Sequence, residues 1–183
     1  MLSNSNKILF YILVLHLTLW TVIPSIINTN LPLDTIEALA WGSNLDWGFN
    51  KHPPMSAFFP EVLYKIFGPQ DWVYYLLSQI FIIISFYFVF KFSKEILKNN
   101  LLSLISVLLL ESIYFFNFTS PEFNVNICQL PFWSLTVYYS WKIFSGKEIK
   151  FLDCFLVGLF AAFGFLSKYL FIYLLFSIDL LFI

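Results

Sequence analysis

Charged residues are scarce in this chain, and arginine is missing altogether. Only 11% of the 183 residues are charged, whereas soluble domains carry about 25%. Hydrophobic residues make up 60% of the chain, and the mean hydropathy is +0.80. All ten basic residues are lysines. Together with the many Phe, Ile and Asn, this preference indicates an AT-rich coding sequence and not a functional requirement for lysine. This composition excludes an ordinary soluble domain and predicts a polytopic membrane protein, whose apolar side chains face lipid and one another.

Several kinds of site are missing as well. The net charge is −1 and no basic stripe is present, so nothing points to nucleic-acid binding. The two cysteines, Cys128 and Cys154, lie inside apolar runs at a spacing that fits neither a zinc site nor a redox pair, which favours a role as small hydrophobes. The sequence contains no Gly-rich phosphate-binding loop, no Ser, His and Asp in the order of a catalytic triad, and no cluster of metal ligands at a fixed spacing.

Long apolar runs predict an all-α fold with about six membrane spans. A hydrocarbon core needs about 20 apolar residues per helix. The predicted spans are 8–27, 72–92, 101–116, 127–144, 151–166 and a sixth that begins near Tyr169. No small-residue cleavage site follows the first run, so we expect a retained span rather than a signal peptide. We expect one transmembrane domain over residues 1–183, and the end inside the apolar run "YLLFSIDLLFI" favours a fragment of a longer protein.

The lysines in short loops predict the orientation. Lys7 precedes the first span. Three lysines follow the second span (Lys91, Lys94 and Lys98) and three follow the fourth (Lys142, Lys147 and Lys150). The loop "NFTSPEFNVN" after the third span has no lysine. By the positive-inside rule the N-terminus is then cytoplasmic. Residues 28–71 form the first extracytoplasmic loop, in which Lys51 and Lys65 are exceptions to the rule.

This long outer loop reads as two amphipathic interfacial helices joined by "NKHPP". Asp34, Glu37, Ala38 and Trp41 are spaced three or four residues apart and so share one helical face. Asp34 also fits an N-cap, with Glu37 completing a capping box, which is a structural alternative to a chemical role. The second helix, "MSAFFPEVLYKIFG", is predicted to be broken by Pro60 and to end at Gly68.

The same loop carries candidate chemistry. An ammonium and an imidazole, at Lys51 and His52, suit a phosphate or pyrophosphate. Pro53 and Pro54 stiffen the backbone that would hold them. A carboxylate suits a general base that takes a proton from an acceptor. The alternatives are that Lys51 snorkels to the interface and that His52 is a satisfied turn residue.

Three further ionisable residues are candidates outside this loop. Glu111 is predicted to lie within a span, where a carboxylate is costly and is either functional or paired with a neighbouring helix. Glu122, in the second outer loop, could face the same cavity as Asp34. Lys168, at the outer end of the fifth span, could reach the same anionic ligand or snorkel.

The stretch "LDTIEALAWGSNLDWGFNKHPPMSAF" resembles the first extracytoplasmic loop of the GT-C class of membrane glycosyltransferases. The resemblance is to the family 39-like group, which is related to the protein O-mannosyltransferases and to the lipid A aminoarabinose transferase. The matching positions are Glu37-Ala38, Trp41, Gly48-Phe49 and His52-Pro53-Pro54. "SPEFNVNICQLPFWSL" is similar to the family's second outer loop, and "GLFAAFGFLSKY" to a later Gly-rich helix that ends in Lys-Tyr. Members are longer, so the resemblance is to their N-terminal part.

The resemblance implies a mechanism and a setting. A sugar on a polyprenyl phosphate would be transferred with inversion to a lipid or protein acceptor on the extracytoplasmic face of the cell inner membrane. Many members have adjacent Asp and Glu, whereas here Ile36 precedes Glu37. The base is therefore expected to be Asp34, with Glu37 as the alternative, and Trp41, Lys51, His52, Glu122 and Lys168 are expected to bind substrate. No cofactor is required, although some relatives bind a divalent metal in this region.

Two other classes explain part of the sequence. A transporter or lipid flippase explains the spans and Glu111 but not the acidic and Lys-His groups of the outer loop, and no internal repeat supports it. An inactive truncated fragment, without catalytic function, is the other alternative.

Overall fold

The computed structural model describes residues 4–146 and 148–182, and within these ranges the chain is helical with no β-strand. The helices in chain order are α1 (Asn4–Ile27), α2 (Leu33–Gly42), α3 (Met55–Phe67), α4 (Asp71–Leu97), α5 (Asn100–Glu111), α6 (Tyr114–Asn117), α7 (Val125–Ser145), α8 (Phe151–Ser167), the 3₁₀ helix η1 (Tyr169–Phe171) and α9 (Ile172–Phe182). The all-α prediction is confirmed. Lys147, one of the lysines used to predict orientation, lies outside the described residues.

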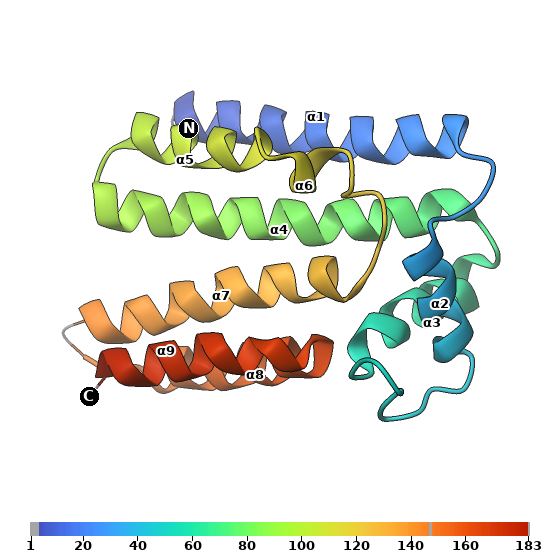
Figure 1. Ribbon diagram of the computed structural model, residues 1–183. Helices are drawn as coiled ribbons and strands as arrows, with labels where there is room; N and C mark the ends of the chain where they lie inside the picture. The colour runs from blue at the N-terminus through green and yellow to red at the C-terminus, as the bar shows by residue number, and fades with distance from the viewer. Residues whose placement is uncertain (1–3, 147, 183) are drawn as a thin grey trace.

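The long helices lie side by side along a common direction, and α2 and α3 pack together at one end of this bundle (Figure 1). Helix α4 is central, because it packs against α1 and α5 on one side and α7 on the other. In the part of the chain that the structure describes, two helices, α1 and α4, are long and apolar enough to cross a membrane. Shorter apolar helices cover Asn100–Glu111, Phe151–Ser167 and Tyr169–Leu181. The arrangement of six spans therefore stays a prediction.

Two predicted details of the outer loop are wrong. Helix α2 begins at Leu33 after Pro32, which adopts an extended conformation, so Asp34 lies in the first turn and does not cap the helix. A carboxylate in the first turn still favours the helix, because it faces the positive end of the helix dipole. Helix α3 continues through Pro60, since the loss of one backbone hydrogen bond is outweighed by burial of this residue against its neighbours. Its end at Gly68, where φ is 71°, is as predicted.

The third predicted span is also interrupted. Helix α5 ends at Glu111, and the short α6 begins at Tyr114. The Asn117 side chain donates hydrogen bonds to the carbonyl oxygen of Glu111, at the end of α5, and to that of Ile113, directly before α6, so it ties the two helices together. Glu111 therefore lies at the end of a helix, not in the middle of a span.

Helices α2 and α3 approach each other closely at Gly42. A Cβ atom at this position would lie 2.6 Å from the Ala57 carbonyl oxygen and 2.8 Å from the Glu61 Cβ. Only glycine fits, so this residue sets the distance between the two outer helices.

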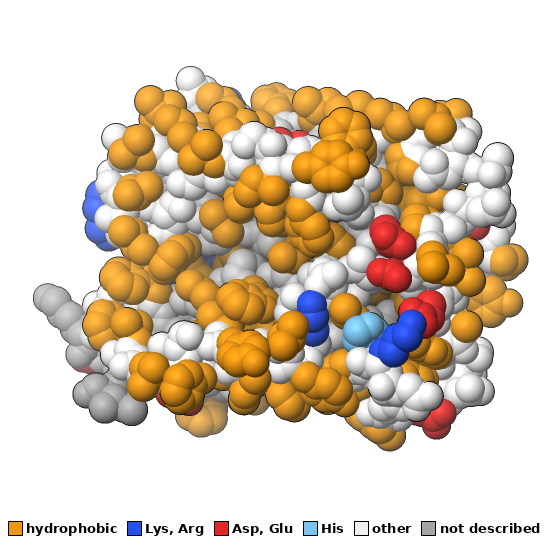
Figure 2. All heavy atoms as spheres, in the orientation of Figure 1, with side chains coloured by type: hydrophobic (Ala, Val, Ile, Leu, Met, Phe, Trp, Pro, Cys, Tyr) orange, Lys and Arg blue, Asp and Glu red, His pale blue; other side chains and the backbone are white. Residues whose placement is uncertain are grey.

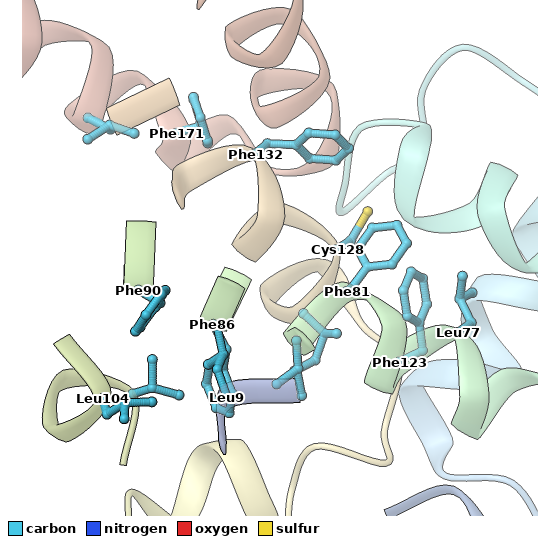
Figure 3. Close-up of a cluster of buried hydrophobic side chains, with 14 residues drawn as sticks. Leu9, Leu77, Phe81, Phe86, Phe90, Leu104, Phe123, Cys128, Phe132 and Phe171 are labelled. Atoms are coloured by element: carbon cyan, nitrogen blue, oxygen red, sulfur yellow. The ribbon is translucent and has the colours of Figure 1, made fainter. Parts of the chain in front are cut away.

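Phenylalanine dominates the core (Figure 3). Phe81 of α4 lies edge-on to Phe123 and Phe132, with ring centroids 5.4 Å and 6.2 Å away. Phe59 of α3 packs on the same ring at 5.0 Å. These contacts join α3, α4, α7 and the loop before α7, and they fix the outer helices on the end of the bundle.

Candidate active site

Polar side chains gather at the end of the bundle where α2 and α3 lie. Figure 2 shows acidic, basic and histidine atoms side by side there, on a face that is otherwise largely apolar. The acidic groups come from α2 and from the loop before α7, and the basic ones from the turn before α3 and from the junction of α8 and η1. Segments far apart in the sequence therefore meet at one place.

One face of α2 lines a small cavity at this end. Its walls are formed by Asp34, Glu37, Ala38, Trp41, His52, Ser56, Asn124 and Val125. The shared helical face predicted from the sequence is therefore confirmed. The cavity volume is about 20 Å³, which is room for about one water molecule. A sugar would have to bind over its mouth or widen it.

Glu37 is held by Lys51. The Lys51 Nζ lies 2.6 Å from Oε1 of Glu37, and the Glu37 side chain is 30% exposed. The same ammonium lies 5.9 Å from the centre of the Trp41 ring. The exposed Lys51 ammonium therefore makes an ion pair and a cation–π contact with two residues that line the cavity, and it is not simply a snorkelling side chain.

His52 is fixed in a small aromatic cluster. Its ring lies edge-on to Trp41 at 5.7 Å, and Trp41 stacks on Phe49 at 5.4 Å. The Phe49 N–H donates to the His52 carbonyl oxygen at 3.1 Å, which closes the turn. Burial lowers the pKa of His52 below 6.5, and the positive charges of Lys168 and Lys51 lower it further, against the opposing effect of Glu37. Near pH 7 the imidazole is therefore neutral and offers one N–H donor.

The second outer loop docks on the start of α2. The Asp34 N–H donates to Oε1 of Glu122 at 3.0 Å, and the Thr35 hydroxyl donates to the Phe123 carbonyl oxygen at 3.2 Å. The Asn124 amide donates to Oδ2 of Asp34 at 3.3 Å. Glu122 therefore lies at the start of α2, but it is not among the residues that line the cavity, so its expected place facing the same cavity as Asp34 stays a prediction.

Asn124 is a site residue that sequence reasoning missed. Its side-chain oxygen caps α7 by accepting from the N–H groups of Asn126 and Ile127 at 2.9 and 3.2 Å. This cap fixes the side chain so that its N–H₂ group faces Asp34. An Asn directly before an apolar helical run is an N-cap signature that was present in the sequence.

Lys168 comes from the far end of the chain. It lies between α8 and η1, and its ammonium donates to the side-chain oxygen of Asn126. It is near enough for its charge to lower the pKa of His52. Glu111 is not part of this site, because it pairs with His16 between α1 and α5.

No three His, Cys, Asp or Glu side chains converge anywhere in residues 4–146 and 148–182. The divalent metal allowed by the family resemblance stays a prediction.

Residues 51–183 match the family model described as dolichyl-phosphate-mannose-protein mannosyltransferase. This range covers most of the chain and includes Lys51, His52, Glu122 and Lys168, whereas Asp34 and Glu37 lie before it. No curated protein and no solved structure matches the chain.

Proposed function

Because the chain belongs to the dolichyl-phosphate-mannose-protein mannosyltransferase family, a group of membrane glycosyltransferases of the GT-C type, we propose that it transfers a sugar from a polyprenyl phosphate to a lipid or protein acceptor. In this proposal the transfer inverts the anomeric centre and occurs on the extracytoplasmic face. The observation that carries it is the convergence of two carboxylates from α2 and an imidazole from the turn before α3 on one cavity at the end of the bundle, with the Lys51 ammonium paired to one of these carboxylates.

Asp34 is the proposed general base. Its carboxylate is exposed and accepts one hydrogen bond from the neutral Asn124 amide, so it is free to take a proton from an incoming hydroxyl or amine. The Glu37 carboxylate is already engaged by the Lys51 ammonium at 2.6 Å. This difference favours Asp34 over Glu37, which instead keeps Lys51 in place.

Lys51, His52 and Lys168 are the proposed phosphate-binding groups. As the acceptor oxygen or nitrogen bonds to the anomeric carbon, the bond from that carbon to the phosphate oxygen breaks and the electron pair leaves with the lipid phosphate. Ammonium groups and an imidazole N–H placed where this charge develops stabilise the transition state. The acceptor proton passes to Asp34, so that atoms and charges balance. Trp41 supplies an aromatic wall next to His52 for the sugar.

The test is transfer from a radiolabelled polyprenyl-phosphate sugar in membranes that contain the protein. Asp34→Asn is expected to reduce transfer by about 10²-fold or more, the scale of a general base. Glu37→Gln should retain measurable activity with weaker donor binding. Asp46→Asn, an exposed carboxylate of the same loop outside the cavity wall, is the matched control. Full activity of Asp34→Asn at unchanged protein abundance would show that Asp34 is not the base.

A further inference from the structure

A second cavity lies at the opposite end of the bundle, between the first half of α1 and the last half of α4. Helices α1 and α4 pack against each other, and the last part of α4 lies at the end of the bundle that holds the N-terminus (Figure 1). The cavity has a volume of about 370 Å³, which falls within the range of small-molecule sites of about 300–1,000 Å³. Its lining residues are Asn6, Leu9, Phe10, Leu13, Tyr87, Phe90, Lys91 and Lys94.

The walls of this cavity are mostly apolar. Its two cationic groups come from successive turns of α4. Leu9, Leu13 and Phe90 are buried or half-buried, and they supply hydrocarbon on both helices. Lys91 and Lys94 are three residues apart on α4, so both face the cavity. Such a site suits a ligand that has an apolar chain and an anionic head.

Neither lysine has an anionic partner among the described residues. Lys142, at the same end of the bundle, is paired with Asp153 at 2.9 Å. Glu95, next to Lys94 in the sequence, instead accepts a hydrogen bond from the Tyr138 hydroxyl at 3.0 Å. No ion pair or side-chain hydrogen bond to Lys91 or Lys94 occurs within residues 4–146 and 148–182.

Both ammonium groups lie against aromatic rings. Lys91 is 5.1 Å from the Tyr138 ring centre and 5.6 Å from that of Tyr87, and Lys94 is 6.0 Å from that of Phe90. Cation–π contacts compensate only part of the cost of half-burying an ammonium group. An anion at the mouth of the cavity would compensate the remaining cost of burying these ammonium groups.

We propose that this cavity binds an anionic phospholipid, with its phosphate between Lys91 and Lys94 and an acyl chain along Leu9, Leu13 and Phe90. A free phosphate ion does not account for the apolar walls, and a neutral lipid does not account for the unpaired ammonium groups. The lysine distribution predicts that this end faces the cytoplasm, where anionic lipids are attracted to basic pockets between membrane helices. The site is separate from the proposed active site at the other end of the bundle.

The test is lipid binding by the full chain, purified in neutral detergent and measured by native mass spectrometry. The probes are dioleoylphosphatidylglycerol and dioleoylphosphatidylcholine. Removing both charges in Lys91→Gln/Lys94→Gln should weaken phosphatidylglycerol binding about thirtyfold and leave phosphatidylcholine binding unchanged. The matched control is Lys98→Gln/Lys150→Gln, which removes the same charge from exposed lysines outside the cavity wall and should change neither.

A second variant tests the apolar part. Leu13→Trp keeps both lysines and fills the cavity, so it should also weaken phosphatidylglycerol binding. The helical circular dichroism of each variant shows whether it has folded. Equal binding of the two lipids, an equal loss in the control variant, or unchanged binding by folded Leu13→Trp would each overturn the proposal.

Discussion

The Nδ1 atom of His16 lies 3.0 Å and 2.8 Å from the two carboxylate oxygens of Glu111, inside an apolar helix bundle. The other ring nitrogen is 2.9 Å from the Gln79 side-chain oxygen, and the Gln79 amide donates to the Ser120 hydroxyl at 3.3 Å. His16, Gln79 and Ser120 are buried. This network ties α1, α4 and α5 to the loop that carries Glu122 and Asn124, so it links the bundle to the proposed active site.

Breaking this network should destabilise the fold. His16→Leu leaves the Glu111 carboxylate without its partner, and we expect a loss of about 1–3 kcal/mol in the free energy of unfolding. His16→Leu/Glu111→Leu should cost less than the sum of the single variants, because the pair is removed together. Thermal unfolding of the detergent-solubilised protein, followed by circular dichroism, measures this. Ser106→Ala, at a half-buried position on α5 that makes no contact with this network, is the control, and strictly additive losses would contradict a coupled pair.

Asn124 should matter for activity through its two hydrogen-bonding roles. Asn124→Asp keeps the cap on α7 but replaces the amide that donates to Asp34 with a second carboxylate, so transfer should fall by about tenfold or more while the fold is retained. Asn124→Ala also loses the cap, which costs about 1 kcal/mol. Initial rates and melting temperatures separate the two effects. Wild-type rates for both variants would show that the contact with Asp34 has no role.

His52 should titrate below pH 6.5 in the folded protein. Glu37→Gln removes the larger of the two negative charges that raise its pKa, the other being Asp34, and should lower the pKa further, whereas Lys51→Gln should raise it. NMR of histidine-labelled protein measures the midpoint, and the His52→Gln spectrum assigns the signal. A raised pKa in Glu37→Gln, or a lowered pKa in Lys51→Gln, would contradict the placement of His52 between these charges.

The same pKa has a consequence for stability. Below pH 6.5 the unfolded chain takes up this proton before the folded chain does, so the stability contributed by His52 is complete above pH 6.5 and declines as the pH falls toward the lowered pKa. His52→Gln should make the melting temperature less dependent on pH across this window. An unchanged dependence would indicate that other groups control it.

Gly164 should tolerate no side chain. A Cβ atom there would lie 2.2 Å from the ring of Phe171, which is fully buried. Gly164→Ala is therefore expected to move η1 and the adjacent Lys168, and to lower both the melting temperature and donor binding. Gly158→Ala on the same helix, where a Cβ meets nothing within 4 Å, is the control. Equal behaviour of the two variants would contradict this close contact.

The sequence was most informative where local rules decide the structure. Apolar runs predicted an all-helical chain, the spacing of Glu37 and Trp41 placed them on one face, and Gly68 marked the end of α3. Local rules were wrong where packing prevailed. Pro60, which is buried, did not break α3. Asp34 did not cap α2 for a local reason, because the extended Pro32 already stands at the N-cap position.

The sequence by itself determined the class of the chain and the residue types of the site, because composition and periodicity depend only on near neighbours along the chain. Tertiary structure decided their partners. That Lys51 holds Glu37, that Asn124 faces Asp34, and that Lys168 lies near His52 depends on packing between segments far apart in the sequence. No pattern in one segment specifies which distant side chain will meet it, since that distance is set by side-chain volumes in the core between them.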